Sequence, residues 1–160
     1  MSKVEFIDQA LLQQVVESAA ASPRRRKNYN FHADDGEASH RLLNAMEMDS
    51  YIPPHCHLDS SKDETILVLR GKLGMVLFDA AGKLTRTEVL QASGATLGIN
   101  IPHGQFHTLV ALEAGSVFFE SKAGPYAPLS AQEKAAWAPT EGAPDAVQYL
   151  AQLKGLFATT

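Results

Sequence analysis

The sequence predicts an all-β domain, an antiparallel sandwich or barrel, with a short helix at each end. Strand-like runs separated by turn signals fill residues 41–122, and no helical pattern lies between them. That order argues against an alternating parallel α/β sheet. Helical periodicity occurs only before and after this region. We therefore expect one domain over residues 1–160, made of an N-terminal helix and arm (1–40), a barrel core (41–122) and a C-terminal extension with a helix (123–160).

The first element is predicted to be a helix that begins after Asp8. Asp8 is suited to the N-cap position, where its carboxylate accepts a backbone N–H. Apolar residues such as Leu12 and Val16 then recur at intervals of four, which indicates one buried stripe. Pro23 ends the pattern. The polar segment that follows, residues 22–40, has little periodicity, so we expect a loop or an extended arm.

The barrel core is predicted as a series of short strands. Gly, Pro, Asp and Asn residues mark the breaks, and "DAAGK" has the composition of a hairpin turn. The expected strands cover residues 41–48, 64–71, 72–79, 84–90, 95–101, 105–112 and 116–122.

Helix is expected again in the C-terminal extension. Ser130 and Glu133 have capping-box spacing ahead of "KAAW", which predicts a short helix there. A second helix is predicted over 144–157, with Pro144 in its first turn. Its apolar stripe consists of Ala146, Leu150, Leu153 and Phe157.

The composition excludes several classes of function. Hydrophobic residues make up 45% and charged residues 20%, as in soluble folded domains. The net charge of −4 argues against binding to nucleic acid, which needs a positive surface. No apolar run is long enough to span a bilayer, and the N-terminus has no apolar signal core. A single cysteine fits a reducing compartment. We expect a cytoplasmic protein with a small-molecule ligand and with no nucleic-acid or membrane partner.

Three histidines and one glutamate form a candidate metal site. His55 and His57 lie two residues apart, so on a strand both project from one face and Cys56 projects from the other, where we expect it to pack. Glu64 opens the next strand and His107 opens the strand after "IPHG". In an antiparallel barrel, strands distant in sequence become neighbours, so these four residues can converge. Three imidazoles and one carboxylate suit Fe(II), Mn(II), Ni(II), Zn(II) or Cu(II) but not calcium, and they leave room for water or substrate.

The order of these residues resembles the two sequence motifs of the cupin superfamily. The first motif corresponds to "HCH", Glu64 and Gly71, and the second to "PHGQFH", which ends in His107. The gap between "HCH" and Glu64 is longer than in the family, so Asp63 and Asp59 are alternatives to Glu64 as the carboxylate ligand. The distance from Glu64 to Gly71 fits the family pattern and favours Glu64.

Longer segments resemble one group of cupins, the WbuC-type cupin fold metalloproteins. The similar segments include "SPRRRKNYNFH", "RLLNAMEMDSYIPPHCH", "IPHGQFHTLVALEAGSVFFESKAGPY" and "WAP". The resemblance implies a cupin double-stranded β-helix, or jelly-roll barrel, that binds one divalent transition metal (Fe, Mn, Ni or Zn). It also implies a homodimer and an association with bacterial surface-polysaccharide biosynthesis.

The function expected from these observations is metal-assisted isomerase or oxygenase chemistry on a small polar molecule, such as a sugar or nucleotide-sugar derivative. Two alternatives stay open. One is a non-catalytic cupin module with a structural or ligand-binding metal, and the other is a metal-free sugar isomerase that uses a histidine as base. The sequence assigns a catalytic role to no residue.

Three further residues are candidates for substrate binding. Arg26 and Asn28 belong to a basic arm that we expect to fold over the barrel mouth, where they would bind an anionic or hydroxylated ligand. The alternative for this arm is a solvated basic face. His103, in the turn before His107, is the third candidate, and the favoured alternative for it is an ordinary turn side chain. His32 and His40 match no motif and are predicted to be ordinary surface residues.

Overall fold

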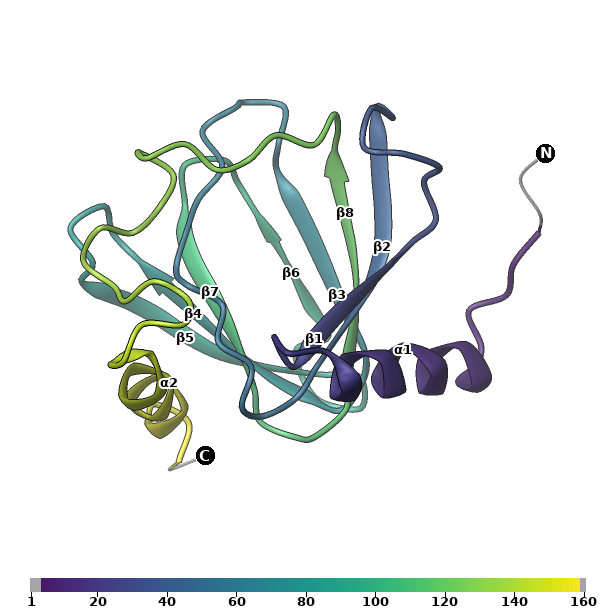
Figure 1. Ribbon diagram of the computed structural model, residues 1–160. Coiled ribbons are helices and arrows are strands. Elements are labelled where there is room, and N and C mark those ends of the chain that lie inside the picture. Colours follow the sequence, from purple (N-terminus) through teal and green to yellow (C-terminus); the bar gives the residue numbers. More distant parts are fainter. Residues whose placement is uncertain (1–3, 159–160) are drawn as a thin grey trace.

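Two antiparallel β-sheets face each other and form an open barrel, with one helix beside each sheet (Figure 1). A computed structural model describes residues 4–158. The larger sheet has the strand order β1-β2-β8-β3-β6 and the smaller sheet β5-β4-β7. The elements are α1 (Gln9–Ala21), β1 (Arg26–Asn30), β2 (Ser39–Met46), β3 (Glu64–Arg70), β4 (Lys72–Phe78), β5 (Leu84–Gln91), β6 (Gly98–Ile101), β7 (Phe106–Ala111), β8 (Ser116–Ala123) and α2 (Ala146–Gly155).

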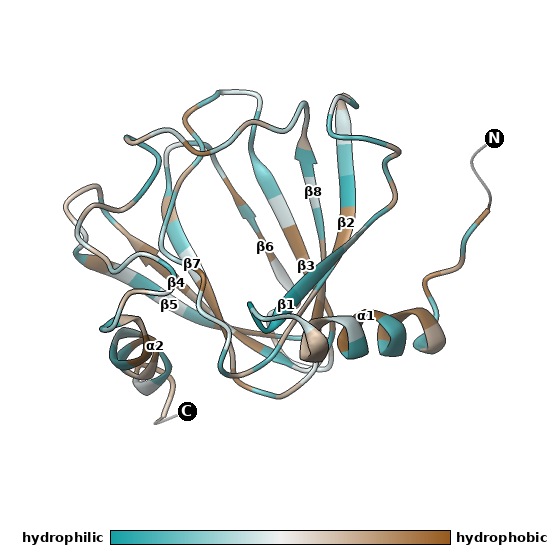
Figure 2. Ribbon diagram, viewed as in Figure 1, coloured by the Kyte–Doolittle hydropathy of each residue, from teal (hydrophilic) through white to brown (hydrophobic). Residues whose placement is uncertain are grey.

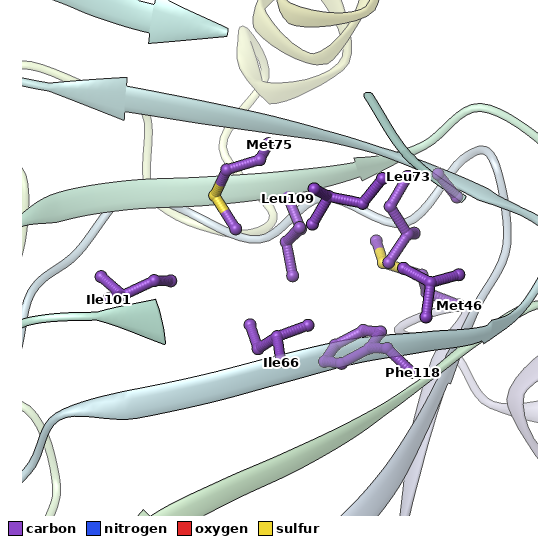
Figure 3. Packing of buried hydrophobic residues seen from close by; sticks show 10 residues of the cluster. Met46, Ile66, Leu73, Met75, Ile101, Leu109 and Phe118 are labelled. Carbon is purple, nitrogen blue, oxygen red and sulfur yellow. The ribbon is translucent and has the colours of Figure 1, made fainter. Parts of the chain in front are cut away.

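The main core lies between the two sheets. Ile66 of β3 and Phe118 of β8 point from the larger sheet toward Met75 of β4 and Leu109 of β7 in the smaller one (Figure 3). Period-two alternation along the strands places these side chains inside, and their removal from water is the main force that holds the sheets together. Hydrophobic colouring covers the lower part of β2, whereas the upper ends of β2 and β8 are mostly hydrophilic (Figure 2). The polar residues of the candidate site come from this hydrophilic end.

The helices cover the outer faces of the sheets. Asp8 caps α1 as predicted, because its Oδ1 accepts the backbone N–H of Leu11 at 2.9 Å. The apolar stripe of α1 packs against residues of β2 and β8 that point away from the main core. The predicted stripe of α2 is buried and packs on the smaller sheet and on Tyr51. None of the helices in the described part of the chain is long and apolar enough to cross a membrane.

Two local predictions need correction. The polar arm contains a regular strand, β1, which pairs with β2 at the edge of the larger sheet. Its side chains are half-buried or exposed, so the apolar alternation that reveals an inner strand is missing. The predicted helix after Ser130 does not form. The Glu133 carboxylate does accept the Ser130 N–H at 2.8 Å, but its other oxygen accepts the Leu58 N–H at 2.9 Å, so Glu133 ties this segment to the one that carries the histidines.

Candidate metal centre

Backbone hydrogen bonds hold the two histidine motifs side by side. The His55 N–H donates to the His107 carbonyl at 3.1 Å, and the His107 N–H donates to the His55 carbonyl at 2.9 Å. The Gly104 N–H donates to the His57 carbonyl at 2.6 Å. The "HCH" segment therefore continues the smaller sheet beyond β7 as an isolated bridge and not as a full strand. These bonds fix the position of all three histidines relative to one another.

The structure brings three of the four candidate ligands into one cluster and places the fourth, His107, beside Glu64. His55, His57 and Glu64 each offer a ligand atom, and these atoms lie within 4.8 Å of one another. His57 Nε2 lies 3.2 Å and His107 Nε2 3.4 Å from Glu64 Oε2. Glu64 is the first residue of β3, and its register on the sheet places it between Ile101 of β6 and Lys122 of β8. Pairing between strands distant in sequence thus produces the convergence expected from the motifs.

The two alternative carboxylates lie outside this cluster. Asp63 Oδ1 accepts hydrogen bonds from the backbone N–H and the Nδ1 of His103, at 2.9 and 2.8 Å. Asp59 Oδ1 accepts from the backbone N–H and hydroxyl of Ser61. Both aspartates stabilise the loop before β3. Glu64 is therefore the carboxylate that the fold directs at the histidines.

Carbonyl groups set the orientation of two imidazole rings. His55 Nδ1 lies 3.0 Å from the Pro53 carbonyl oxygen, and His107 Nδ1 lies 2.9 Å from that of Gln105. A carbonyl oxygen can only accept, so Nδ1 carries the proton in the neutral ring and Nε2 keeps its lone pair. Histidines that bind metals are commonly oriented by such a hydrogen bond.

The protonation states also suit a cation. Burial, together with repulsion from His107, lowers the pKa of His55 to about 3, so this ring is neutral at physiological pH. Burial by itself raises the pKa of Glu64, but the nearby His107 and His57 and the charge of Lys122 outweigh it and hold that pKa well below its usual value. The cluster thus presents a carboxylate beside neutral imidazole.

One atom of the cluster needs a partner that the described residues do not supply. Glu64 Oε2 is buried and makes no hydrogen bond of normal geometry within residues 4–158. The Nε2 atoms of His57 and His107 are close, but they are not aligned to donate a proton to it. A buried, unpartnered carboxylate oxygen is costly. A divalent cation bound by this oxygen and by the Nε2 lone pairs would remove that cost, so these residues fit a borderline transition metal.

Three polar residues that sequence reasoning missed adjoin the cluster. Lys122 Nζ lies 3.1 Å from Glu120 Oε1, and the Asn44 amide donates to Glu120 Oε2 at 2.9 Å. Burial and the charge of Glu64 raise the pKa of Glu120 to about 7, while Lys122 acts in the opposite direction. A sequence signal did exist, because in "FFESK" the inward face that carries Phe118 continues with Glu120 and Lys122.

Two cavities adjoin the cluster and share His55 and Arg26 in their walls. The inner cavity has a volume of about 100 Å³ and is lined by Asn44, Glu64, His107 and Glu120, among others. The outer cavity has a volume of about 390 Å³ and lies between residues 52–55 and residues 129–141. The shared walls place the larger cavity directly beside the candidate metal ligands.

The three predicted substrate-binding residues lie in different places. Arg26 lines both cavities, but its guanidinium binds the carboxylate of Glu141 at 2.8 and 2.9 Å and the Tyr51 carbonyl at 3.0 Å. Asn28 is exposed on β1, donates to Asn30 Oδ1 at 2.6 Å and lines neither cavity. His103 is half-exposed and paired with Asp63.

The prediction for two other histidines is wrong. His32 and His40 are both 6% exposed, and their rings stack at a centroid distance of 4.1 Å. His32 Nδ1 lies 3.2 Å from backbone atoms of Arg41, and His40 Nε2 lies 3.2 Å from the Asp35 carbonyl. These contacts satisfy the rings inside the folded arm, which a search for motifs does not detect. Cys56 is fully buried, in agreement with a packing role, and lies outside the group of candidate ligands.

Comparisons with known proteins agree with the fold. The chain resembles the structure of KdgF from Halomonas sp. (TM-score 0.50, 16% identity, 65% of this chain and 83% of that chain). It also resembles a conserved protein of unknown function from Streptococcus pyogenes (TM-score 0.51, 13% identity, 79% and 93%). An oxalate decarboxylase structure matches with a TM-score of 0.50 and 21% identity over 66% of this chain, which corresponds to 28% of that chain. These likenesses confirm the cupin jelly-roll fold.

Family membership comes from the sequence. No curated protein matches the chain. One family model, described as a domain of unknown function (DUF6016), matches residues 7–90, which is more than half of the chain and includes "HCH" and Glu64. The chain therefore belongs to the DUF6016 family and folds as a cupin barrel.

Proposed function

We propose that this cupin binds one divalent transition metal and acts on a small polar molecule by metal-assisted isomerase or oxygenase chemistry. The observation that carries the proposal is the buried Glu64 Oε2, which has no hydrogen-bond partner among the described residues but lies within 3.4 Å of two imidazole Nε2 atoms. His55, His57, Glu64 and His107 would hold the ion. When bound, iron, manganese, nickel or zinc supplies Lewis-acid chemistry, and iron can also activate oxygen.

The cavities support a ligand the size of a sugar or a nucleotide-sugar fragment. The inner cavity, about 100 Å³, is smaller than ordinary ligand sites of roughly 300 Å³ or more, whereas the outer one reaches about 390 Å³. A ligand would occupy the outer cavity and extend one polar group past His55. Arg24, Arg26 and Lys134 line the outer cavity against the single carboxylate of Glu141, and this excess of positive charge favours an anionic derivative.

Side chains of the inner cavity would orient that polar group. The Asn44 amide and the Glu120 carboxyl offer hydrogen bonds to ligand oxygens. Asp63 accepts a hydrogen bond from His103 Nδ1, which leaves Nε2 for a ligand, and we propose His103 as a substrate-binding residue. We propose Arg26 as a residue of the cavity wall, where its guanidinium is already bound by Glu141. Asn28 would bind substrate only if the ligand extends along the exposed β1.

The wider biological setting is proposed from the sequence alone. The segments between residues 22 and 139 that resemble WbuC-type cupins support a homodimer linked to surface-polysaccharide biosynthesis, and the single cysteine supports a cytoplasmic location.

Metal content tests the proposal directly. Protein purified without a histidine tag, stripped with chelator and reconstituted, should contain about one equivalent of metal by elemental analysis. Glu64→Gln and His107→Ala should lose it. Asp63→Asn and Asp59→Asn are the matched controls, because each alters an alternative carboxylate outside the cluster, and both should retain it. Less than about a tenth of an equivalent in the unaltered protein would rule out the metal site.

A further inference from the structure

The ammonium group of Lys122 lies among the atoms assigned to the metal. Its Nζ is 3.3 Å from His57 Nε2 and 3.7 Å from Glu64 Oε1. The side chain is only 20% exposed, so solvent screens these charges weakly. The position is fixed by the sheet, because Lys122 of β8 lies opposite Glu64 of β3 in the strand register. Lys122 is thus a built-in cation at this end of the barrel.

A lysine ammonium and a metal ion cannot both use His57. The ammonium has three donors and no lone pair, so its contact with Nε2 uses the lone pair of that nitrogen. A metal–imidazole bond uses a lone pair on a ring nitrogen as well. Nε2 has only one lone pair, and the two cations also repel each other at this distance. Metal binding through His57 Nε2 therefore requires the ammonium to leave.

Glu120 provides the place to which the ammonium can move. Its Oε1 already lies 3.1 Å from Lys122 Nζ, and Asn44 holds its other oxygen. Glu120 is 9% exposed, so its carboxylate needs a cation or a donor close by. A small rotation of the lysine side chain toward Glu120 would release His57 and Glu64 without leaving any buried charge unpaired.

We infer that Lys122 competes with the metal for His57 and Glu64, and that Glu120 holds its ammonium group when the metal is bound. The inference rests on the proposed metal site. In the metal-free protein Lys122 supplies the positive charge that keeps the ligands ordered. Its displacement lowers the metal affinity below the value that the four ligands alone would give.

Zinc titration of the chelator-stripped, untagged protein tests the inference. In isothermal calorimetry, Lys122→Met should bind Zn²⁺ about tenfold more tightly than the unaltered protein, since the competing cation is gone. Lys72→Met is the matched control, because it removes one positive charge from an exposed pair with Glu113, and its affinity should stay within about twofold. Melting of the metal-free forms supplies a second reading. Lys122→Met should melt at a lower temperature and yet bind metal more tightly. If Lys122 had a merely structural role, its replacement would lower both the melting temperature and the metal affinity.

Further variants keep the test decisive. Lys122→Gln takes the place of Lys122→Met if the latter does not fold, with the same expected gain. Glu120→Gln should bind Zn²⁺ more weakly, because the displaced ammonium then has no carboxylate, and unchanged binding would overturn the role of Glu120. Equal or weaker binding by the Lys122 variant overturns the inference while the metal site stands. If the unaltered protein binds no Zn²⁺, Mn²⁺ or Fe²⁺, the proposed function fails and the inference fails with it.

Discussion

At the scale of single residues, Gly71 shows how one motif position shapes the end of a strand. It joins β3 to β4 with a φ of +75°, in the left-handed region that side chains with a Cβ rarely adopt. A Cβ built there would lie 2.9 Å from Cα of Ser116, whose hydroxyl bonds the Lys72 backbone. Both the backbone conformation and the lack of space therefore require glycine.

Replacement of Gly71 by alanine should destabilise the protein by roughly 1–3 kcal/mol, because strain and crowding act together. Gly155→Ala is the matched control. It lies at the end of α2 with no atom within 4 Å of its built Cβ, and it should be neutral or gain up to about 1 kcal/mol. Urea unfolding of both variants measures the difference. Similar free energies of unfolding for the two variants would contradict this account.

At the scale of elements, sequence periodicity was sufficient wherever one face of an element is buried. The strands that contribute to the main core and the apolar stripe of α2 were predicted for this reason. β1 was missed because an exposed edge strand needs no apolar alternation. The grouping of Asn44 with Glu120 depends on pairing between β2 and β8, which one sequence does not reveal. The histidines were predictable only because two short motifs had a recognisable order.

Contacts between β1 and the C-terminal extension should depend on pH. Burial raises the pKa of Glu141, but hydrogen bonds from Arg24 and Arg26 outweigh it and lower that pKa to about 2. A carboxylate whose pKa is lowered in the folded state stabilises the protein at pH values above its usual pKa of 4.5. It loses this effect as the pH falls toward its folded pKa of about 2. Glu141→Gln should therefore cost about 1 kcal/mol at pH 7, after allowance for solvent screening, and clearly less at pH 3.

Thermal unfolding at the two pH values measures this contribution. Glu113→Gln, which breaks the exposed pair with Lys72, serves as the control and should change stability little at either pH. A cost for Glu141→Gln that is as large at pH 3 as at pH 7 would exclude the ion pair as its cause.

At the scale of the whole molecule, the proposed ligands come from three separate parts of the chain. His55 and His57 precede β3, Glu64 opens it, and His107 lies on β7 of the other sheet. An ion bound by all of them would connect the two sheets at one end of the barrel. Because an unfolded chain cannot hold these residues together, metal binding at this site would be linked to global stability.

Metal at a hundred times its dissociation constant should raise the free energy of unfolding by ~2.7 kcal/mol. Calorimetric melting with and without chelator measures the shift in melting temperature. His107→Ala should show no such shift, whereas Asp59→Asn should keep it. A metal-dependent shift of equal size in His107→Ala would place the binding elsewhere on the protein.

The bridge between His55 and His107 also has a consequence for the order of assembly. Its two hydrogen bonds close a loop of about fifty residues that contains both strands of the β4–β5 hairpin. During synthesis the hydrogen bonds between His55 and His107 can form only after all of β3 to β6 and the start of β7 have emerged. The entropic cost of closing this loop is offset only when the contacts between the sheets have formed. An ion held by both segments would therefore bind only after they have come together.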